Sequence, residues 1–128
     1  MISGMNKTTM LFIKKMLNQC QQCVGFYGAV LSSPDGLILA SSGHFSGDEA
    51  AAAASSIMVD ASKGLSMIAE AKTQEILIWS EDKLFSIRRL KDDSILMIGS
   101  EDLACVVDIR FISEKVSHEL DMALNILG

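Results

Sequence analysis

Residues 28–56 read GAVLSSPDGLILASSGHFSGDEAAAAASS, and this stretch decides the fold. Apolar residues lie on both sides of the turn Ser33–Gly36, in which proline presets φ and aspartate and glycine tolerate a tight backbone. The first part therefore predicts an antiparallel hairpin. The last part is rich in alanine and begins with Asp48 and Glu49, which suit the positive end of a helix dipole. It predicts a helix capped by Ser46 or Asp48.

The rest of the chain continues as separate helix and strand patterns. Apolar side chains recur at helical spacing near both ends, and Asn6 or Thr8 can cap the first helix. Three apolar segments separated by polar turns predict an antiparallel meander. The expected helices are 6–20, 48–72 and 107–127, and the expected strands are 24–32, 37–41, 74–80, 84–90 and 94–100. The order α-β-β-α-β-β-β-α predicts an α+β fold, a five-stranded antiparallel sheet with helices on both faces.

Length and composition limit the function classes. The 128 residues contain no linker, so a single domain spanning 1–128 is expected. Hydrophobic residues make up 49% of the chain and charged residues 21%, which is enough apolar material for a core. The formal net charge of −5 argues against nucleic-acid binding, which needs Lys and Arg to neutralise phosphates.

The N-terminal region has no targeting pattern. Its apolar stretch, Met10–Ile13, is shorter than the core of a secretory signal and is followed at once by Lys14 and Lys15. No run of about 18 apolar residues is present, so we expect no insertion into a membrane. A soluble, cytoplasmic protein is expected.

The cysteines are one candidate for metal or redox chemistry. Cys20 and Cys23 have C-x-x-C spacing, and Cys105 is the third cysteine. A tetrahedral zinc site needs a second ligand pair, which is absent. A redox pair would open a helix, whereas this pair closes one. Reduced, semi-buried thiols are favoured, and no metal or cofactor is expected.

Catalytic residues are also not recognisable. Lys63 is not part of a P-loop. In Gly43–Gly47 the serine comes one place too late for a nucleophile elbow. His44 and His118 are far apart and favour loop or surface roles. We therefore expect a non-enzymatic protein.

Three arginines raise the idea of an arginine finger. An alternating strand sends Arg88 and Arg89 to opposite faces, and a finger normally needs a flexible loop. Ordinary ion pairs are therefore favoured for these two residues and for Arg110.

The middle helix is unusual because it has few charges on either side. One arc is expected to pack on the sheet, and it contains Ala50, Ala54, Ile57, Ala61, Leu65 and Ile68. The opposite arc contains Ala52, Ser56, Val59, Lys63, Ser66, Met67 and Glu70. Either the alanines are simply good helix formers, or a second chain buries the outer arc.

The strand over 74–80 favours the second interpretation. Ile76 and Ile78 alternate with Leu77 and Trp79, so both faces are apolar. At a sheet edge such a strand tends to pair, and pairing with its own copy is one solution. The residues expected at a dimer or partner interface are Ala52, Ser55, Ser56, Val59, Ser62, Lys63, Ser66, Met67, Leu77 and Trp79.

The chain resembles the roadblock / dynein light chain family, whose architecture is profilin-like or longin-like. The resemblance covers nearly the whole length and rests on the element order, the hairpin over 28–41 and the small-residue helix that begins at Asp48. It implies a homodimer, or a heterodimer with a paralogous roadblock chain. In such a dimer the middle helices pack together and the third strands pair into one sheet.

The family resemblance also implies a function. Members scaffold or regulate Ras-like small GTPases, some as GTPase-activating proteins, and the short chain looks like the simpler prokaryotic members. Two alternatives remain. One is a structural light chain or sensory scaffold with no GTPase partner. The other is a small-molecule-binding or enzymatic domain, which would need a ligand-sized cavity.

Overall fold

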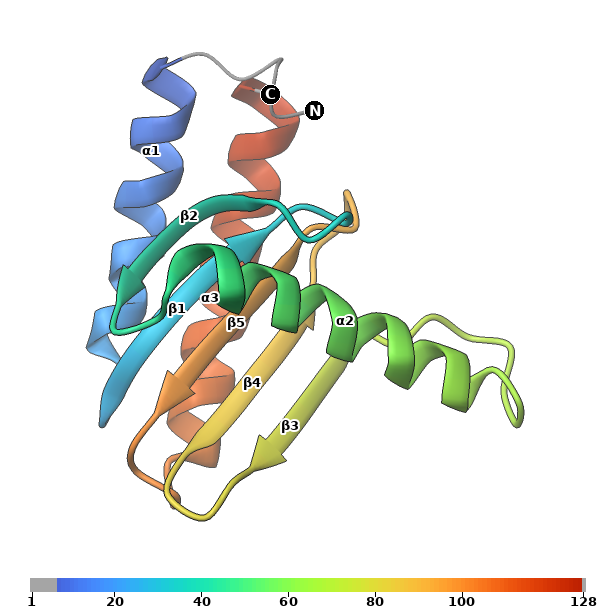
Figure 1. Cartoon of the computed structure of the whole chain (residues 1–128). Coiled ribbons are helices and arrows are strands. Elements are labelled where there is room, and N and C mark those ends of the chain that lie inside the picture. The colour runs from blue at the N-terminus through green and yellow to red at the C-terminus, as the bar shows by residue number, and fades with distance from the viewer. Residues whose placement is uncertain (1–6, 128) are drawn as a thin grey trace.

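A five-stranded antiparallel sheet forms the centre of the fold, in the strand order β2-β1-β5-β4-β3 (Figure 1). The computed structural model describes residues 7–127, and its element order confirms the predicted fold class. The elements are α1 (Lys7–Leu17), a 3-10 helix η2 (Asn18–Gln22), β1 (Phe26–Ser32), β2 (Ile38–Gly43), α2 (Gly47–Leu65), β3 (Glu75–Trp79), β4 (Leu84–Arg89), β5 (Ile95–Ser100) and α3 (Val106–Leu127).

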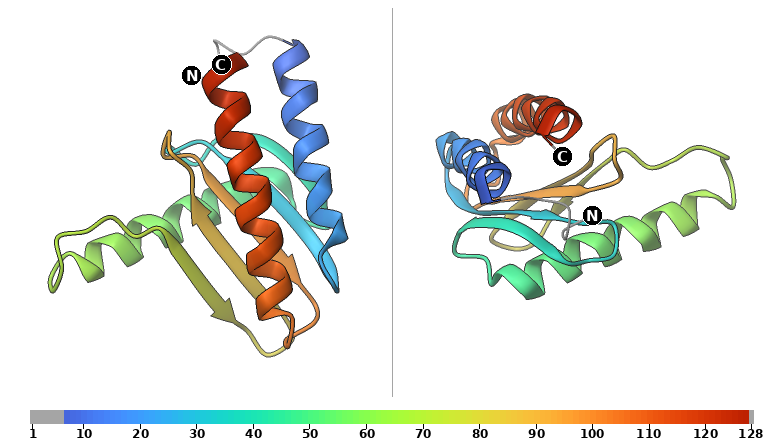
Figure 2. Two further views of the ribbon diagram at one scale, coloured as in Figure 1. Left: turned by 180° about the vertical axis from the view of Figure 1, so that it is seen from behind. Right: turned by 90° about the horizontal axis from the view of Figure 1, so that it is seen from above.

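The helices cover the two faces of the sheet unequally. α1 and α3 lie side by side on one face, and α2 crosses the other face alone (Figure 2). Alternation along the strands separates two cores, because successive side chains of a strand point to opposite faces. In β1, Leu31 belongs to the core under α1 and α3, whereas Val30 belongs to the core under α2.

Two glycines make room for an aromatic ring on the α2 face. Gly28 of β1 and Gly99 of β5 are register partners. A Cβ at Gly28 would lie 2.9 Å from Phe45 Cγ and 3.0 Å from the Phe45 backbone nitrogen, and one at Gly99 would lie 3.0 Å from Phe45 Cζ. Phe45 therefore lies over the sheet at a place where neighbouring strands carry no side chain.

The ends of several elements differ from the sequence prediction. The first helix ends at Leu17, and the 3-10 helix η2 follows from Asn18. At its end the Cys23 N–H donates to the Cys20 carbonyl over 3.0 Å. β1 begins at Phe26 because Gly25, at φ +68°, turns the chain beforehand. Thr8 lies inside α1 and is not its cap, and Asn6 lies outside the described residues.

The largest difference concerns α2, which ends at Leu65 and not near Lys72. Ser66 Oγ donates to the carbonyl of Lys63 over 2.7 Å, and residues 66–68 continue as turns. No residue from 59 to 72 is buried. The prediction that Leu65 and Ile68 pack on the sheet was therefore wrong, because the helix has already passed the last strand.

Ser46 occupies the N-cap position of α2, but its side chain makes no capping hydrogen bond. Its carbonyl accepts from Ala50 N–H over 2.8 Å, so the helix starts on a backbone contact alone. Asp48 and Glu49 lie in the first turn, as expected for the positive end of the dipole.

Candidate interaction surface

The C-terminal part of α2 projects beyond the edge of the sheet (Figure 1). We call residues 59–68 the overhang. Its apolar members have no sheet beneath them: Val59 is 45% exposed, Met67 85% and Ile68 83%. Large apolar side chains grouped in this way are uncommon on the surface of a monomer and mark an interaction site.

Most of the interface residues expected on the outer side of α2 are exposed. They are Ala52, Ser56, Val59, Lys63, Ser66 and Met67. Two other expected interface residues, Ser55 and Ser62, make contacts within their own chain. Ser55 is buried and its Oγ donates to the carbonyl of Pro34 over 2.9 Å, so this serine closes the β1–β2 turn. Ser62 is partly buried and accepts from Arg89. Both hydroxyls thus contact their own chain in the monomer.

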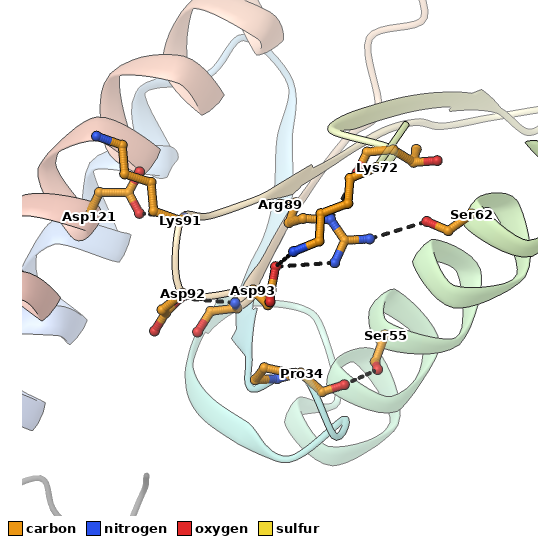
Figure 3. Close-up of polar contacts among 11 residues, drawn as sticks. Pro34, Ser55, Ser62, Lys72, Arg89, Lys91, Asp92, Asp93 and Asp121 are labelled. Carbon is orange, nitrogen blue, oxygen red and sulfur yellow. Dashed lines mark hydrogen bonds and ion pairs between the residues drawn. The ribbon is translucent and has the colours of Figure 1, made fainter. Parts of the chain in front are cut away.

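Arg89 of β4 binds the overhang at Ser62 (Figure 3). Its Nη2 donates to Ser62 Oγ over 3.2 Å, and its Nε donates to the Thr73 carbonyl over 2.9 Å. Its Nη1 lies 3.5 Å from Asp93, which also pairs with Lys72 at 2.8 Å. The Lys72 ammonium, with Arg89 as a weaker contributor, lowers the pKa of the Asp93 carboxyl below its usual value. The network joins both ends of the α2–β3 connection to β4.

β3 is an edge strand. Within residues 7–127 it pairs with β4, and no strand lies on its other side. Leu77 is half-buried and Trp79 is 51% exposed. The indole Nε1 of Trp79 donates to the Leu103 carbonyl over 3.0 Å, which ties the end of the strand to the loop before α3. The strand over 74–80 therefore meets the condition under which pairing with a second copy was expected.

Next to β3, the α2 face of the sheet has an apolar area that α2 does not cover. We call Tyr27, Phe45, Ile78 and Phe85 the shelf; all four are half-buried. The ring centroids of Phe45 and Phe85 are 6.4 Å apart, and those of Tyr27 and Phe45 are 5.8 Å apart. In Figure 1, α2 leaves the lower ends of β3 and β4 uncovered.

The shelf was not found from the sequence. Its aromatic residues come from a strand, a loop and a second strand that are far apart along the chain. The only local signal was Phe45 between glycines, which was interpreted as a loop before the helix. Lys83 Nζ lies 4.6 Å from the centre of the Tyr27 ring and marks the border of the shelf with a positive charge.

The three arginines all form ion pairs, which confirms that prediction. Arg88 and Arg110 both pair with Glu75 at 2.8 Å, and the Nε of Arg88 also donates to Ser113. The hydrogen bond to Glu75 raises the pKa of Arg110. Arg88 faces α3 and Arg89 faces α2, so the two side chains lie on opposite faces of the sheet as expected.

All three cysteines are free thiols and are more deeply buried than predicted. Burial raises the pKa of Cys20 to about 12, and burial together with Cys105 and Asp108 raises that of Cys23 to about 12. Neither thiol is therefore prepared for nucleophilic or redox chemistry. Among residues 7–127, no group of three His, Cys, Asp or Glu side chains could hold a metal ion.

His44 lies in the loop between β2 and α2, and His118 lies on α3. His44 stacks on Tyr27 with a ring-centroid distance of 5.3 Å, and His118 is on the exposed side of α3. None of the helices in the described part of the chain is long and apolar enough to cross a membrane.

The sequence and the fold both match known proteins. The model of the Roadblock/LC7 domain matches residues 12–100, which is more than half of the chain. This chain belongs to the Roadblock/LC7 family. The predicted family is thereby confirmed. No curated protein matches the chain by sequence.

Solved structures of roadblock proteins share its fold. Myxococcus xanthus MglB superposes with a TM-score of 0.85 at 12% identity, covering 97% of this chain and 96% of that one. The gliding protein MglB of Thermus thermophilus gives 0.81 at 14% identity, covering 93% of each chain. A Roadblock/LC7 domain of Streptomyces avermitilis gives 0.80 at 16% identity, covering 87% and 96%. At these identities the likeness shows the fold alone.

Proposed function

We propose that this roadblock chain is a non-enzymatic homodimeric module that binds and regulates a Ras-like small GTPase. The main support for the proposed dimer is a pair of complementary surfaces on one molecule. The overhang is an apolar helix segment with no sheet beneath it, and the shelf is a half-buried apolar area at the margin of the core under α2.

A two-fold axis through paired β3 strands would bring the overhang of each chain against the shelf of the other. Antiparallel pairing of β3 with its copy turns two edges into one continuous ten-stranded sheet, because each chain contributes five strands. Both α2 helices then lie on the same face. The overhang of each chain points toward the uncovered ends of β3 and β4 in the other chain, where the shelf lies. A paralogous roadblock chain with the same features could take the place of the second copy.

The small GTPase as partner is supported by family likeness. Two of the structural relatives above are MglB proteins, and one of these is described as a gliding protein. The charge-poor outer side of α2, around Lys63 and Ser66, becomes the centre of the dimer face and offers a surface for the GTPase.

Any stimulation of GTP hydrolysis would act indirectly. An arginine finger must reach the nucleotide from an exposed position. Arg88 and Arg89 are mostly buried in ion pairs, and Arg110 is bound by both carboxylate oxygens of Glu75. We therefore propose that the dimer changes the conformation of the partner's switch regions and supplies no catalytic group.

Capture of the partner tests this proposal. The tagged chain is incubated with lysate of its native source, loaded with either GDP or a non-hydrolysable GTP analogue. We expect capture of a small GTPase that depends on the nucleotide and is lost in Val59→Glu. Leu37→Glu is the matched control, since Leu37 is an exposed apolar residue in the β1–β2 turn. Capture of a GTPase that is equal for both nucleotides, or unchanged by Val59→Glu, would contradict the proposal.

The second candidate is a structural light chain or sensory scaffold. The same dimer surfaces support it, since they require no nucleotide. Capture of a non-GTPase protein, lost in Val59→Glu and insensitive to nucleotide, would favour this function.

A further inference from the structure

The face of the molecule opposite α2 carries two exposed apolar sites of opposite charge. The first is an open groove of about 470 Å³ at the start of α3. Its apolar lining includes Val24, Val107 and Phe111, and Val107 is 84% and Phe111 65% exposed. Side chains of this size normally pack inside a protein.

The charged residues that line this groove are acidic. Asp102 Oδ1 accepts from the backbone N–H of Ala104 over 2.9 Å, and Asp108 Oδ2 accepts from the backbone N–H of Val24 over 2.7 Å. Neither carboxylate is neutralised by a cationic side chain in these contacts. The groove therefore fits an apolar group flanked by positive charge.

The second site is the outer side of α1. Leu11 is 64% exposed, and Lys7, Lys14 and Lys15 surround it on the exposed side of the helix. The helix has three lysines and no acidic residue. Since the whole chain carries −5, the rest of the chain carries −8. α1 is thus the basic apolar element of an acidic protein.

The two sites lie at opposite ends of the same layer (Figure 2). α1 begins beside the C-terminal end of α3, whereas the groove lies at the N-terminal end of α3. One molecule cannot bring its own Leu11 to its own groove. Two molecules that face each other in opposite directions can make both contacts at once, in a closed two-fold arrangement.

We propose that a second copy of this chain occupies the groove, with Leu11 of each copy packed against Phe111 of the other. The lysines of α1 then face Asp102 and Asp108. The contact leaves α2 and β3 free. Combined with the dimer proposed above, on which this step of assembly rests, it joins two dimers back to back. Their α1 and α3 helices form the centre, and their α2 surfaces point outward to partners.

The molar mass of the full-length protein in solution tests this contact. At about 0.05 M salt and high protein concentration, we expect wild type to approach four times the chain mass of 13.8 kDa. Phe111→Lys and Leu11→Glu should each raise the tetramer dissociation constant at least about tenfold, a loss common for a central apolar contact. About 0.5 M salt should also weaken the tetramer, since it screens the charge pairs. Leu37→Lys, a matched change at another exposed leucine, should leave the tetramer intact.

The failure of this contact is distinguishable from failure of the α2–β3 dimer. If only the back-to-back contact exists, wild type has twice the chain mass, Phe111→Lys reduces it to one, and Val59→Glu has no effect. If both exist, the double variant Val59→Glu/Phe111→Lys is monomeric. Wild type that never exceeds the dimer, with Phe111→Lys unchanged in mass, overturns the proposal.

A basic apolar helix could instead bind an anionic lipid surface. Sedimentation with vesicles of phosphatidylcholine and phosphatidylserine tests this outcome. Binding that Leu11→Glu abolishes and Phe111→Lys preserves, without any tetramer, would assign α1 to the lipid surface and overturn the proposal.

Discussion

Arg89 on β4 donates a hydrogen bond of 3.2 Å from its Nη2 to the Oγ of Ser62 on α2, and this contact fixes the point at which α2 leaves the sheet. The same guanidinium holds the Thr73 carbonyl just before β3. Arg89 therefore contacts both the projecting helix α2 and the residue that leads into the edge strand β3. Both parts of the proposed dimer surface depend on this residue for their relative position.

Arg89→Lys should loosen this arrangement. Lysine keeps the charge but cannot reach the serine, the carbonyl and the carboxylate together, because it lacks the planar fork of the guanidinium. We expect the free energy of unfolding to fall by about 1–3 kcal/mol, measured by urea denaturation. Amide hydrogen exchange in residues 59–68 should also accelerate. Arg110→Lys is the control, since Arg110 is largely exposed and solvent screens its ion pair with Glu75. An equal effect of both variants would contradict the assigned role of Arg89.

Asp93→Asn should give a pH-dependent loss of stability. Asn tolerates the left-handed backbone at this position, where φ is 69°, so the change removes mainly the charge. Lys72 and Arg89 lower the pKa of Asp93 in the folded state. The stabilising contribution is therefore present above the unfolded pKa of about 3.9 and is lost as the pH falls through the lower folded value. Wild type should unfold at higher urea than the variant at pH 7, and the difference should shrink below pH 4. A difference that grows on acidification would refute this sign.

Two glycine substitutions should have opposite effects. Gly28→Ala places a Cβ 3.0 Å from the Phe45 backbone nitrogen, so it should cost about 1–3 kcal/mol and disturb the shelf. Gly64→Ala lies in α2, and the added Cβ would meet nothing within 4 Å beyond its chain neighbours and the backbone of its own helix, so it should stabilise the helix by up to about 1 kcal/mol. Thermal unfolding of both variants checks this pair. Stabilisation by Gly28→Ala would show that the ring does not rest on the strand as described.

The cysteines should resist alkylation in the folded protein. The pKa values of Cys20 and Cys23, both raised to about 12, leave little reactive thiolate at pH 8. Iodoacetamide should modify these two thiols within minutes in denaturant and far more slowly in buffer, as measured by mass spectrometry of peptides. Rapid modification of Cys23 in the folded protein would instead point to an accessible redox site.

The element order and sheet were predictable because the signals that specify them are local. The Ser33–Gly36 turn fixes the first hairpin, and the alternation at Ile76 and Ile78 marks a strand with two apolar faces. The end of α2 was not predictable, because residues 66–72 continue the helical pattern while the sheet beneath has ended. Whether Leu65 is buried depends on where β3 lies, which is a property of the tertiary fold.

The candidate site was only partly predictable for the same reason. An exposed outer arc follows from helical spacing, and it correctly included Val59 and Met67 among exposed residues. Ser55 was misplaced because the turn carbonyl of Pro34 receives its hydroxyl, a contact over 21 residues. The shelf brings Tyr27, Phe45 and Phe85 together from three separate elements, so no local spacing could indicate it.

The oligomeric state of Val59→Glu tests the proposed dimer most directly. Val59 is exposed, so glutamate leaves the monomer fold intact but places a charge against the partner's apolar surface. Light scattering after size exclusion, at about 0.5 M salt to screen the back-to-back contact, should give twice 13.8 kDa for wild type and 13.8 kDa for Val59→Glu. Val107→Glu, a matched change on the other face, should remain dimeric. A monomeric wild type, or a Val59→Glu protein that remains dimeric, would contradict the account.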